Sequence, residues 1–173
     1  MVGQEIGGGK IRMGIKDAKR FILLVPLLTV VSSTLVVIFR GGLIGMFNTA
    51  GTITELTLST AYTIMAIYAV EFPIRNFIFV IITGVFRSGG DTKTGMKYDL
   101  VCLWGFSVTA ALISAFVLKL PFVWVYAISL AFEDLPKAIL CLKHFFSKRW
   151  IMPVTETGKE ALLEYKKELN KIT

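Results

Sequence analysis

Four long apolar stretches, separated by short polar or glycine-rich segments, dominate the hydrophobic pattern of the chain. The first, Phe21–Phe39, is nineteen residues without a charge, and as a helix it would extend about 28 Å, close to the thickness of a bilayer's hydrocarbon core. Leu100–Leu118 is equally long and equally apolar. Such blocks are typical of membrane-spanning helices, because a soluble helix is usually apolar on one face alone. The pattern predicts four spans, at about residues 20–40, 56–86, 98–118 and 121–146.

The residues that interrupt the apolar runs predict where the helices begin, end and bend. We expect the first helix to open between Asp17 and Arg20, and the glycine-rich segment 40–55 to form a loop. As a straight helix, Leu56–Phe86 would be about 46 Å long, which is too long for a simple span. Because Pro73 lacks an amide donor, we predict that this helix is kinked or broken there.

The last segment, residues 154–173, follows a different pattern. Thr157 and Glu160 have the spacing of a capping box, which satisfies free amides at the start of a helix. Apolar residues then recur every three or four positions, at Leu162, Tyr165, Leu169 and Ile172. We therefore predict a short amphipathic helix on the cytoplasmic side, without chemistry of its own. The predicted fold class is all-α: an integral membrane helical bundle over residues 1–153, followed by this cytoplasmic tail helix.

Composition and charge favour a membrane protein with a defined orientation. Hydrophobic residues make up 54% of the chain and charged residues 18%, with a mean hydropathy of +0.68 and a formal net charge of +7. The cations stand beside the apolar runs, which suits an anionic lipid surface better than nucleic acid. If the termini are cytoplasmic, the inside stretches 1–20, 87–97 and 143–159 carry five, three and four Lys or Arg residues, whereas the outside loops carry Arg40 and Lys119. This bias predicts a multi-pass protein with a cytoplasmic C-terminus. We expect its location to be the plasma membrane.

The sequence contains no pattern of a soluble enzyme. Its one histidine, His144, stands without a cluster of partners in a basic, aromatic border that ends in Trp150, and we expect it at the solvent or the membrane interface. Residues 7–10 lack the Gly-Lys-Ser/Thr spacing and the preceding strand of a phosphate loop. Cys102 and Cys141 fall inside apolar runs and are expected to be packed thiols. We expect no enzymatic activity, metal or cofactor.

Glu71 is the most informative single residue. A carboxylate in the middle of an apolar segment is costly in lipid and usually faces a cavity, a partner or a proton path. Arg75 lies four residues further on, on the same helical face, so Glu71 forms either a structural ion pair or part of an ion or substrate site. Asn76 can offer its amide to a cation or a ligand. With Tyr68, these residues are our candidates for an ion-coupling or substrate cavity.

A second acidic pair, Glu133 and Asp134, lies inside the fourth predicted span. Lys137 follows at i+4 and i+3 and can pair with either carboxylate. We interpret this group as a structural ion pair, and an ion or substrate role is the alternative.

Two polar stretches resemble motifs of one transporter family. Gly3-Gln4-Glu5-Ile6-Gly7-Gly8-Gly9-Lys10 is similar to the glycine motif after the second helix of each half in the MATE (multidrug and toxic compound extrusion) family. Gly84-Val85-Phe86-Arg87-Ser88-Gly89-Gly90-Asp91-Thr92-Lys93 resembles that family's Gly-x-x-Arg-Gly-x-Gly-Asp-Thr motif between the fourth and fifth helices of a half, with Ser88 in place of a glycine. The positions expected to be structural are Gly3, Gly7, Gly84, Arg87, Gly89, Gly90, Asp91 and Thr92. The order and spacing of the motifs extend the resemblance over residues 1 to about 153.

The resemblance implies a multidrug efflux antiporter. Family members have twelve helices in two lobes and export cationic, amphipathic compounds by alternating access in exchange for Na⁺ or H⁺. This chain would supply the last four helices, as a truncated, C-terminal part whose partners are the missing N-terminal lobe and helices, the lipid bilayer and cationic small molecules. Acids on the seventh and tenth helices hold the cation in many members, and Glu71 and Asn76 are the nearest candidates on the tenth-helix equivalent.

The sequence is also compatible with two other functions. One is a related flippase for lipid-linked or polysaccharide precursors, and the other is a free-standing four-helix membrane protein that assembles or regulates without transport. The loop over residues 84–97 is interpreted as a cytoplasmic hinge and topology anchor rather than a substrate site. Within it, Asp91 can cap the following helix or pair with Arg87.

Overall fold

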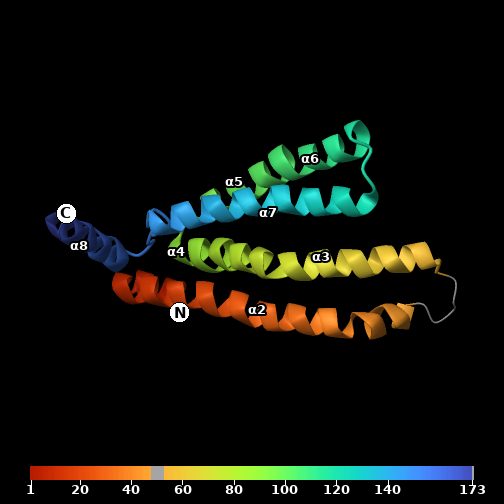
Figure 1. The fold of residues 1–173 in the computed structure, drawn as a ribbon. Coiled ribbons are helices and arrows are strands. Elements are labelled where there is room, and N and C mark those ends of the chain that lie inside the picture. Colours follow the sequence, from red (N-terminus) through yellow and green to blue (C-terminus); the bar gives the residue numbers. More distant parts are fainter. Residues whose placement is uncertain (48–52, 173) are drawn as a thin grey trace. The chain divides into compact units, whose positions relative to one another are not determined.

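The computed structural model describes residues 1–47 and 53–172, and side chains as far as Glu168. Within these residues the elements are all helices, apart from an isolated antiparallel bridge between Gly90 and Ile151 (Figure 1). The predicted all-α class is therefore confirmed. In chain order the elements are α1 (Val2–Gly7), α2 (Ile11–Phe47), α3 (Glu55–Phe79), the π-helical η1 (Val80–Phe86), α4 (Arg87–Gly89), α5 (Thr92–Leu100), the π-helical η2 (Val101–Val108), α6 (Thr109–Leu112), the π-helical η3 (Ile113–Val117), α7 (Phe122–Phe146) and α8 (Glu156–Ile172).

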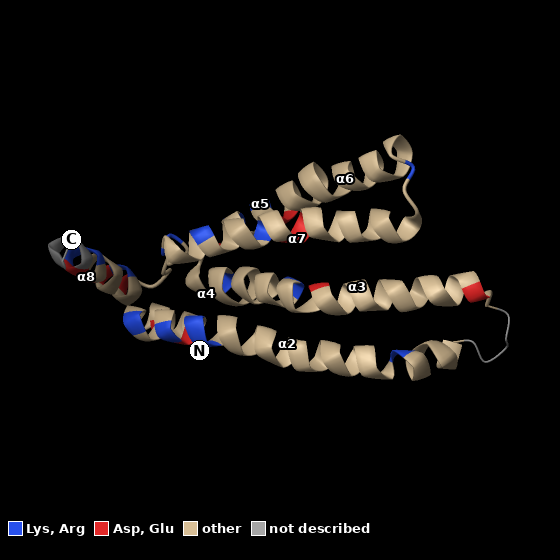
Figure 2. Cartoon of the chain, viewed as in Figure 1, with Lys and Arg blue, Asp and Glu red and all other residues tan. Residues whose placement is uncertain are grey.

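Three continuous helical stretches in the described part of the chain are long and apolar enough to cross a membrane. They comprise Ile11–Phe47, Glu55–Gly89 and Thr92–Val117. In Figure 2 the first turns of α2 and the described part of α8 are coloured for charged residues, whereas a long middle stretch of α2 has none. Helix α7 has 25 residues, enough for a span, but it contains two acids, Glu133 and Asp134, and two lysines, Lys137 and Lys143. Its role as a fourth span stays a prediction.

Helix α2 is longer at both ends than the sequence predicted. It begins at Ile11 rather than near Asp17, and it continues to Phe47 through residues that were expected to form a loop. The glycines of that stretch each cost a helix only about 1 kcal/mol, and apolar side chains such as Leu43 and Ile44 continue the run. The rest of the predicted loop, residues 48–52, lies outside the described residues.

The second long helix is not broken at Pro73. Helix α3 runs through the proline to Phe79 and continues as η1. A spanning helix tolerates proline because neighbouring groups can compensate for the single backbone hydrogen bond that is lost. The stretch ends at Gly90, whose φ of +98° lies in the left-handed region that glycine adopts without steric cost.

The chain forms two compact units, each built from separate parts of the sequence. Unit 1 comprises residues 1–25, 77–99 and 137–173, and unit 2 comprises residues 26–76 and 100–136. Unit 1 has a core that includes Ile6, Phe86 and Trp150. Cys102 and Cys141 are both fully buried, which confirms that they pack inside the protein.

Helix α8 starts earlier than predicted. Its cap is Thr155 rather than Thr157, because the Thr155 hydroxyl accepts a hydrogen bond from the amide of Gly158 at 3.2 Å. The same hydroxyl donates to the carbonyl of Gly7 at 2.6 Å, and this contact fixes the start of the helix. The predicted apolar stripe continues to Leu169 and Ile172, whose side chains lie outside the described part.

Candidate functional site

Helices α3 and α7 bring three carboxylates together around one arginine in unit 2. Arg75 Nε lies 3.0 Å from Oε1 of Glu71, one helical turn away, and 3.2 Å from Oδ2 of Asp134. Arg75 Nη2 lies 3.2 Å from the same Asp134 oxygen and 3.8 Å from Oε2 of Glu133. The predicted pair of Glu71 and Arg75 is confirmed, and it is part of a larger cluster that crosses between two helices. We call these four residues the acid cluster.

Two members of the acid cluster are buried. Glu71 is 9% exposed and Asp134 is 3% exposed. Oε2 of Glu71 is buried and has no hydrogen-bond partner among the described residues. A buried carboxylate oxygen without a donor is costly, so this atom has an unfilled capacity for a proton or a cation. An ionisable side chain within a membrane-spanning segment commonly marks an ion or substrate pathway, which makes Glu71 a candidate for such a site.

A hollow of about 460 Å³ lies beside the acid cluster. Its walls are almost entirely apolar, and Glu71 and Asp134 supply its two acids. A cavity with apolar walls and a few convergent polar groups is the usual form of a small-molecule site. The lining is Ala66, Ile67, Val70, Glu71, Ile74, Ala127, Leu130, Ala131, Asp134 and Leu135.

The other residues predicted for this site lie outside the lining. Asn76 donates its amide to the carbonyl of Phe72 at 2.9 Å, within its own helix, and Tyr68 packs against the ring of Phe72. The sequence pattern pairs Asp134 with Lys137, so the place of Asp134 at the cavity was not predicted. The structure gives Lys137 a further partner, Asp99, with Nζ 3.1 Å from Oδ1. The sequence did contain one indication of this site, because Glu71 and Asp134 are both acidic residues within predicted apolar spans.

A second cluster, in unit 1, is built on the two glycine motifs. The amide of Met152 donates to the carbonyl of Gly89 at 2.7 Å, next to the bridge between Gly90 and Ile151. A Cβ atom at Gly89 would lie 2.4 Å from Cε3 of Trp150, so only glycine allows this approach. The segment that follows α7 therefore lies directly on the glycines of the second motif.

Trp150 is a packing residue and not part of an aromatic membrane border. Its side chain is fully buried, stacks on Phe145 with 5.7 Å between ring centroids, and donates to the Phe145 carbonyl at 3.1 Å. The sequence placed it at the interface because aromatic residues beside cations are common there. The close approach of Gly89 accounts for its burial instead.

The first motif packs onto the same cluster. A Cβ atom at Gly3 would lie 3.0 Å from the carbonyl oxygen of Ser88, and one at Gly158 would lie 2.8 Å from the carbonyl oxygen of Ile6. With the hydrogen bond from Thr155 to Gly7, these approaches join α1, the second motif and the start of α8. Gly3 and Gly89 thus lack a side chain at points where two segments of the chain come into close contact.

Asp91 has two roles in this cluster. Its Oδ1 accepts a hydrogen bond from the amide of Thr94 at 3.2 Å, which confirms the predicted cap of the next helix. Its Oδ2 lies 2.7 Å from Nε2 of His144. Burial would raise the pKa of Asp91, but hydrogen bonds from Thr94 and His144 outweigh it and hold that pKa below its ordinary value.

The location of His144 corrects the expectation of a histidine at the solvent or the interface. Its side chain is 12% exposed and contacts the rings of Phe86 and Tyr98 edge-on. The partner that the structure gives to Asp91 is this histidine, while Arg87 is exposed. The sequence did not predict this contact because it is a tertiary contact, with His144 and Asp91 separated by 53 residues along the chain.

Comparison with known protein families identifies a matching family model. A family model described as MatE matches residues 1–113, a range that includes both glycine motifs, Glu71 and Arg75. No curated protein and no solved structure matches the chain significantly.

Proposed function

Because the chain belongs to the MatE family of multidrug and toxic compound extrusion transporters, we propose that it forms part of an antiporter that exports cationic, amphipathic compounds in exchange for Na⁺ or H⁺. The family match and three long apolar helices make it a multi-pass membrane protein of the transporter class. The acid cluster and its cavity support the finer proposal.

The observation that carries the proposal is the buried Glu71 carboxylate at the wall of an apolar cavity. The apolar walls suit the hydrophobic part of an amphipathic compound, and the two acids suit its positive charge. A proton or Na⁺ neutralises the same carboxylates, so a coupling ion and a cationic substrate compete for them. Competition for one site, exposed alternately to the two sides, is sufficient for exchange.

Arg75 positions the acids in this scheme. It bonds Glu71 on its own helix and Asp134 on α7, so it holds the two cavity acids in a fixed relation. The guanidinium cannot lose its charge under ordinary conditions, and it therefore offsets part of the repulsion between the carboxylates at all times. Glu71 Oε2, which Arg75 does not bond, is the atom that we assign to the exchanged cation.

The proposal also covers the membrane location of the chain, its orientation and the helices that would surround the site. We propose a location in the plasma membrane with the C-terminus in the cytoplasm, which the distribution of Lys and Arg supports. We propose that this chain supplies the last four helices of a twelve-helix transporter, as the resemblance to the family implies. The remaining helices would then close the cavity and bring a second set of acids.

Resistance of cells to ethidium tests the proposal, with the protein expressed from its complete gene in a drug-sensitive host. Expression should raise resistance, and Glu71→Gln should abolish the gain at unchanged protein level, because the amide cannot exchange a cation. Glu55→Gln is the matched control, an exposed acid at the start of the same helix, and should keep full resistance. Equal resistance with Glu71→Gln and the unchanged protein would exclude Glu71 from the mechanism.

A further inference from the structure

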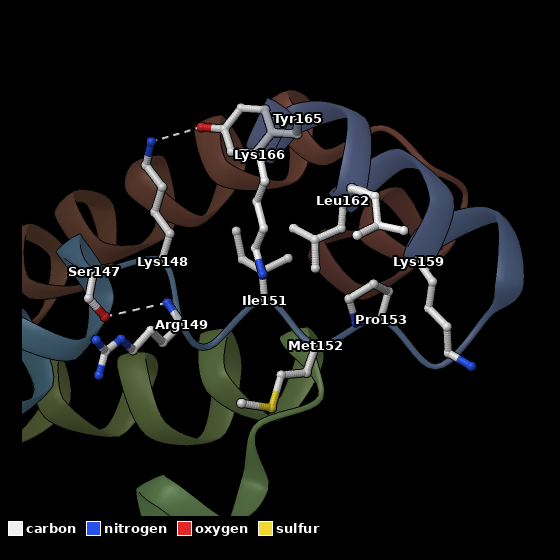
Figure 3. A pocket seen from close by; sticks show the side chains of 11 residues that line it. Ser147, Lys148, Arg149, Ile151, Met152, Pro153, Lys159, Leu162, Tyr165 and Lys166 are labelled. Atoms are coloured by element: carbon white, nitrogen blue, oxygen red, sulfur yellow. Dashed lines mark hydrogen bonds between the residues drawn. The ribbon is translucent and has the colours of Figure 1, made fainter. Parts of the chain in front are cut away.

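A second hollow, of about 640 Å³, lies in unit 1 between residues 147–153 and helix α8 (Figure 3). Its lining combines an apolar surface with four cations, and we call it the basic pocket. The apolar residues are Ile151, Met152, Pro153, Leu162 and Leu163, and the cations are Lys148, Arg149, Lys159 and Lys166. Ser147 and Tyr165 complete the lining, which contains no acid in the described part of the chain.

The fold separates the charges of α8, although they balance in the sequence. Lys159 and Lys166 share the face that lines the basic pocket, with Leu162 and Leu163 between them. Glu164 and Glu168 line a different hollow, of about 300 Å³, where they meet cations at the start of α2. There, Oε2 of Glu168 lies 2.7 Å from Nη2 of Arg12. Glu168 is thus engaged away from the basic pocket, whose own lining in the described part of the chain holds four cations and no acid.

Lys148 and Lys166 place two cations at the wall of the basic pocket. Lys148 Nζ donates to the hydroxyl of Tyr165 at 2.8 Å and lies 5.2 Å above that ring, so this ammonium is held at the pocket wall. In Figure 3, Lys166 extends from α8 toward residues 147–153. Lys159 pairs with Glu156 at 2.8 Å, but both side chains are exposed, so water and salt weaken this pair.

Exposed apolar side chains surround the same pocket. Met152 and Leu163 belong to its lining, Val154 and Phe146 lie next to it in the sequence, and all four are exposed. Phe146 is also the last residue of α7. Cations that alternate with exposed apolar groups, at the point where a long apolar helix ends, are typical of the headgroup level of a membrane.

We propose that the basic pocket binds an anionic phospholipid, with the phosphate between the cations and the acyl chains against the exposed apolar residues. Ammonium and guanidinium groups form charge-assisted hydrogen bonds with phosphate oxygens. A small soluble anion would leave the apolar surface uncovered, and a cationic drug would be repelled. The pocket is separate from the acid cluster, so this site does not depend on the transport mechanism proposed above.

Native mass spectrometry of the purified full-length chain tests the proposal. The protein in detergent is mixed with dioleoyl phosphatidylglycerol or with dioleoyl phosphatidylcholine, and the bound fraction is titrated. We expect retention of the anionic lipid and about fivefold weaker binding of it to Lys166→Gln, since one cation near an anionic headgroup contributes about 1 kcal/mol. Lys167→Gln is the matched control, because this neighbouring exposed lysine does not line the pocket. It should bind within about twofold of the unchanged chain.

A second variant, Arg149→Gln, and a competing anion, inorganic phosphate, test the same lipid site. Arg149→Gln removes an exposed cation from the opposite wall and should weaken binding as Lys166→Gln does. Equal binding of the two lipids, or equal losses in Lys166→Gln and Lys167→Gln, would overturn the proposal in favour of non-specific attraction. Displacement of the lipid by equimolar inorganic phosphate would overturn it too, because a phosphate site without lipid contacts would then account for the binding.

Discussion

Nε2 of His144 lies 2.7 Å from Oδ2 of Asp91, so the last turn of α7 contacts one of the two residues between α4 and α5. The carboxylate also caps α5 through the amide of Thr94. One buried side chain thus fixes the end of one helix and the start of another. Asp91 occupies the aspartate position of the family motif. Its contacts with His144 and Thr94 give that position a structural function.

The first prediction concerns this contact. Asp91→Ala removes the cap and leaves His144 without its partner, so we expect a loss of about 1–3 kcal/mol in the free energy of unfolding. The measurement is thermal unfolding in detergent, followed by tryptophan fluorescence. Glu156→Ala, which removes one member of an exposed ion pair, should change stability by less than about 1 kcal/mol. Similar losses in both variants would show that the contact between Asp91 and His144 contributes no more to the free energy of unfolding than an exposed ion pair does.

A second prediction follows from the lowered pKa of Asp91. Because this pKa is lower in the folded protein than the ordinary value of 3.8, the charged carboxylate stabilises the fold above about pH 4. That contribution is lost as the pH falls through the folded-state pKa. Asp91→Asn lacks it at every pH, so the stability difference between the unchanged protein and the variant should shrink below about pH 4. Unfolding midpoints from about pH 6 to about pH 3 test this, and a constant difference would contradict it.

A third prediction contrasts two glycines. Gly89→Ala would place a Cβ atom 2.4 Å from the ring of Trp150 and 2.6 Å from its carbonyl oxygen, so we expect destabilisation by about 2 kcal/mol or more. Gly45 lies inside α2, where a Cβ atom would meet no described atom of another segment within 4 Å, and Gly45→Ala should stabilise by about 0.5–1 kcal/mol. The same unfolding assay serves both variants. Tolerance of Gly89→Ala would show that residues 150–152 can move away from the second motif.

A fourth prediction concerns the acid cluster. Arg75→Gln leaves the Glu71 and Asp134 carboxylates without their shared cation, and because Arg75 is partly exposed we expect a loss of about 1–3 kcal/mol. Adding Glu71→Gln should restore part of that loss, since it removes one of the carboxylates left behind. A double-mutant cycle by thermal unfolding measures this coupling. Strictly additive losses would mean that Arg75 and Glu71 do not interact in the native protein.

The sequence predicted those parts of the fold that depend on local pattern. Unbroken apolar runs located the long helices, the spacing of four residues paired Glu71 with Arg75, and the position of Asp91 before α5 identified a cap. Helix ends were less well predicted. In α2 the glycines after Arg40 suggested a loop, but their low helix propensity was outweighed by the surrounding apolar residues.

The parts that the sequence did not predict depend on contacts between distant segments. Asp134 reaches Arg75 across 59 residues, and its local neighbour Lys137 suggested a simpler pairing. Trp150 resembled an interfacial aromatic until the structure placed it against Gly89. For Asp134, helical spacing could show which residues share a face but not which helix covers that face. Trp150 follows the end of α7 at Phe146, and its local sequence did not show that it packs against the second glycine motif.

The most direct test of the account is ethidium transport by the complete gene product in liposomes, with a Na⁺ gradient or a pH gradient imposed separately. We predict that one of the gradients drives export, and that Glu71→Gln lowers the driven rate about tenfold or more, while Glu55→Gln leaves it unchanged. A driven rate for Glu71→Gln within about twofold of the unchanged protein, with the same ion dependence, would contradict the assignment of Glu71 as the coupling carboxylate.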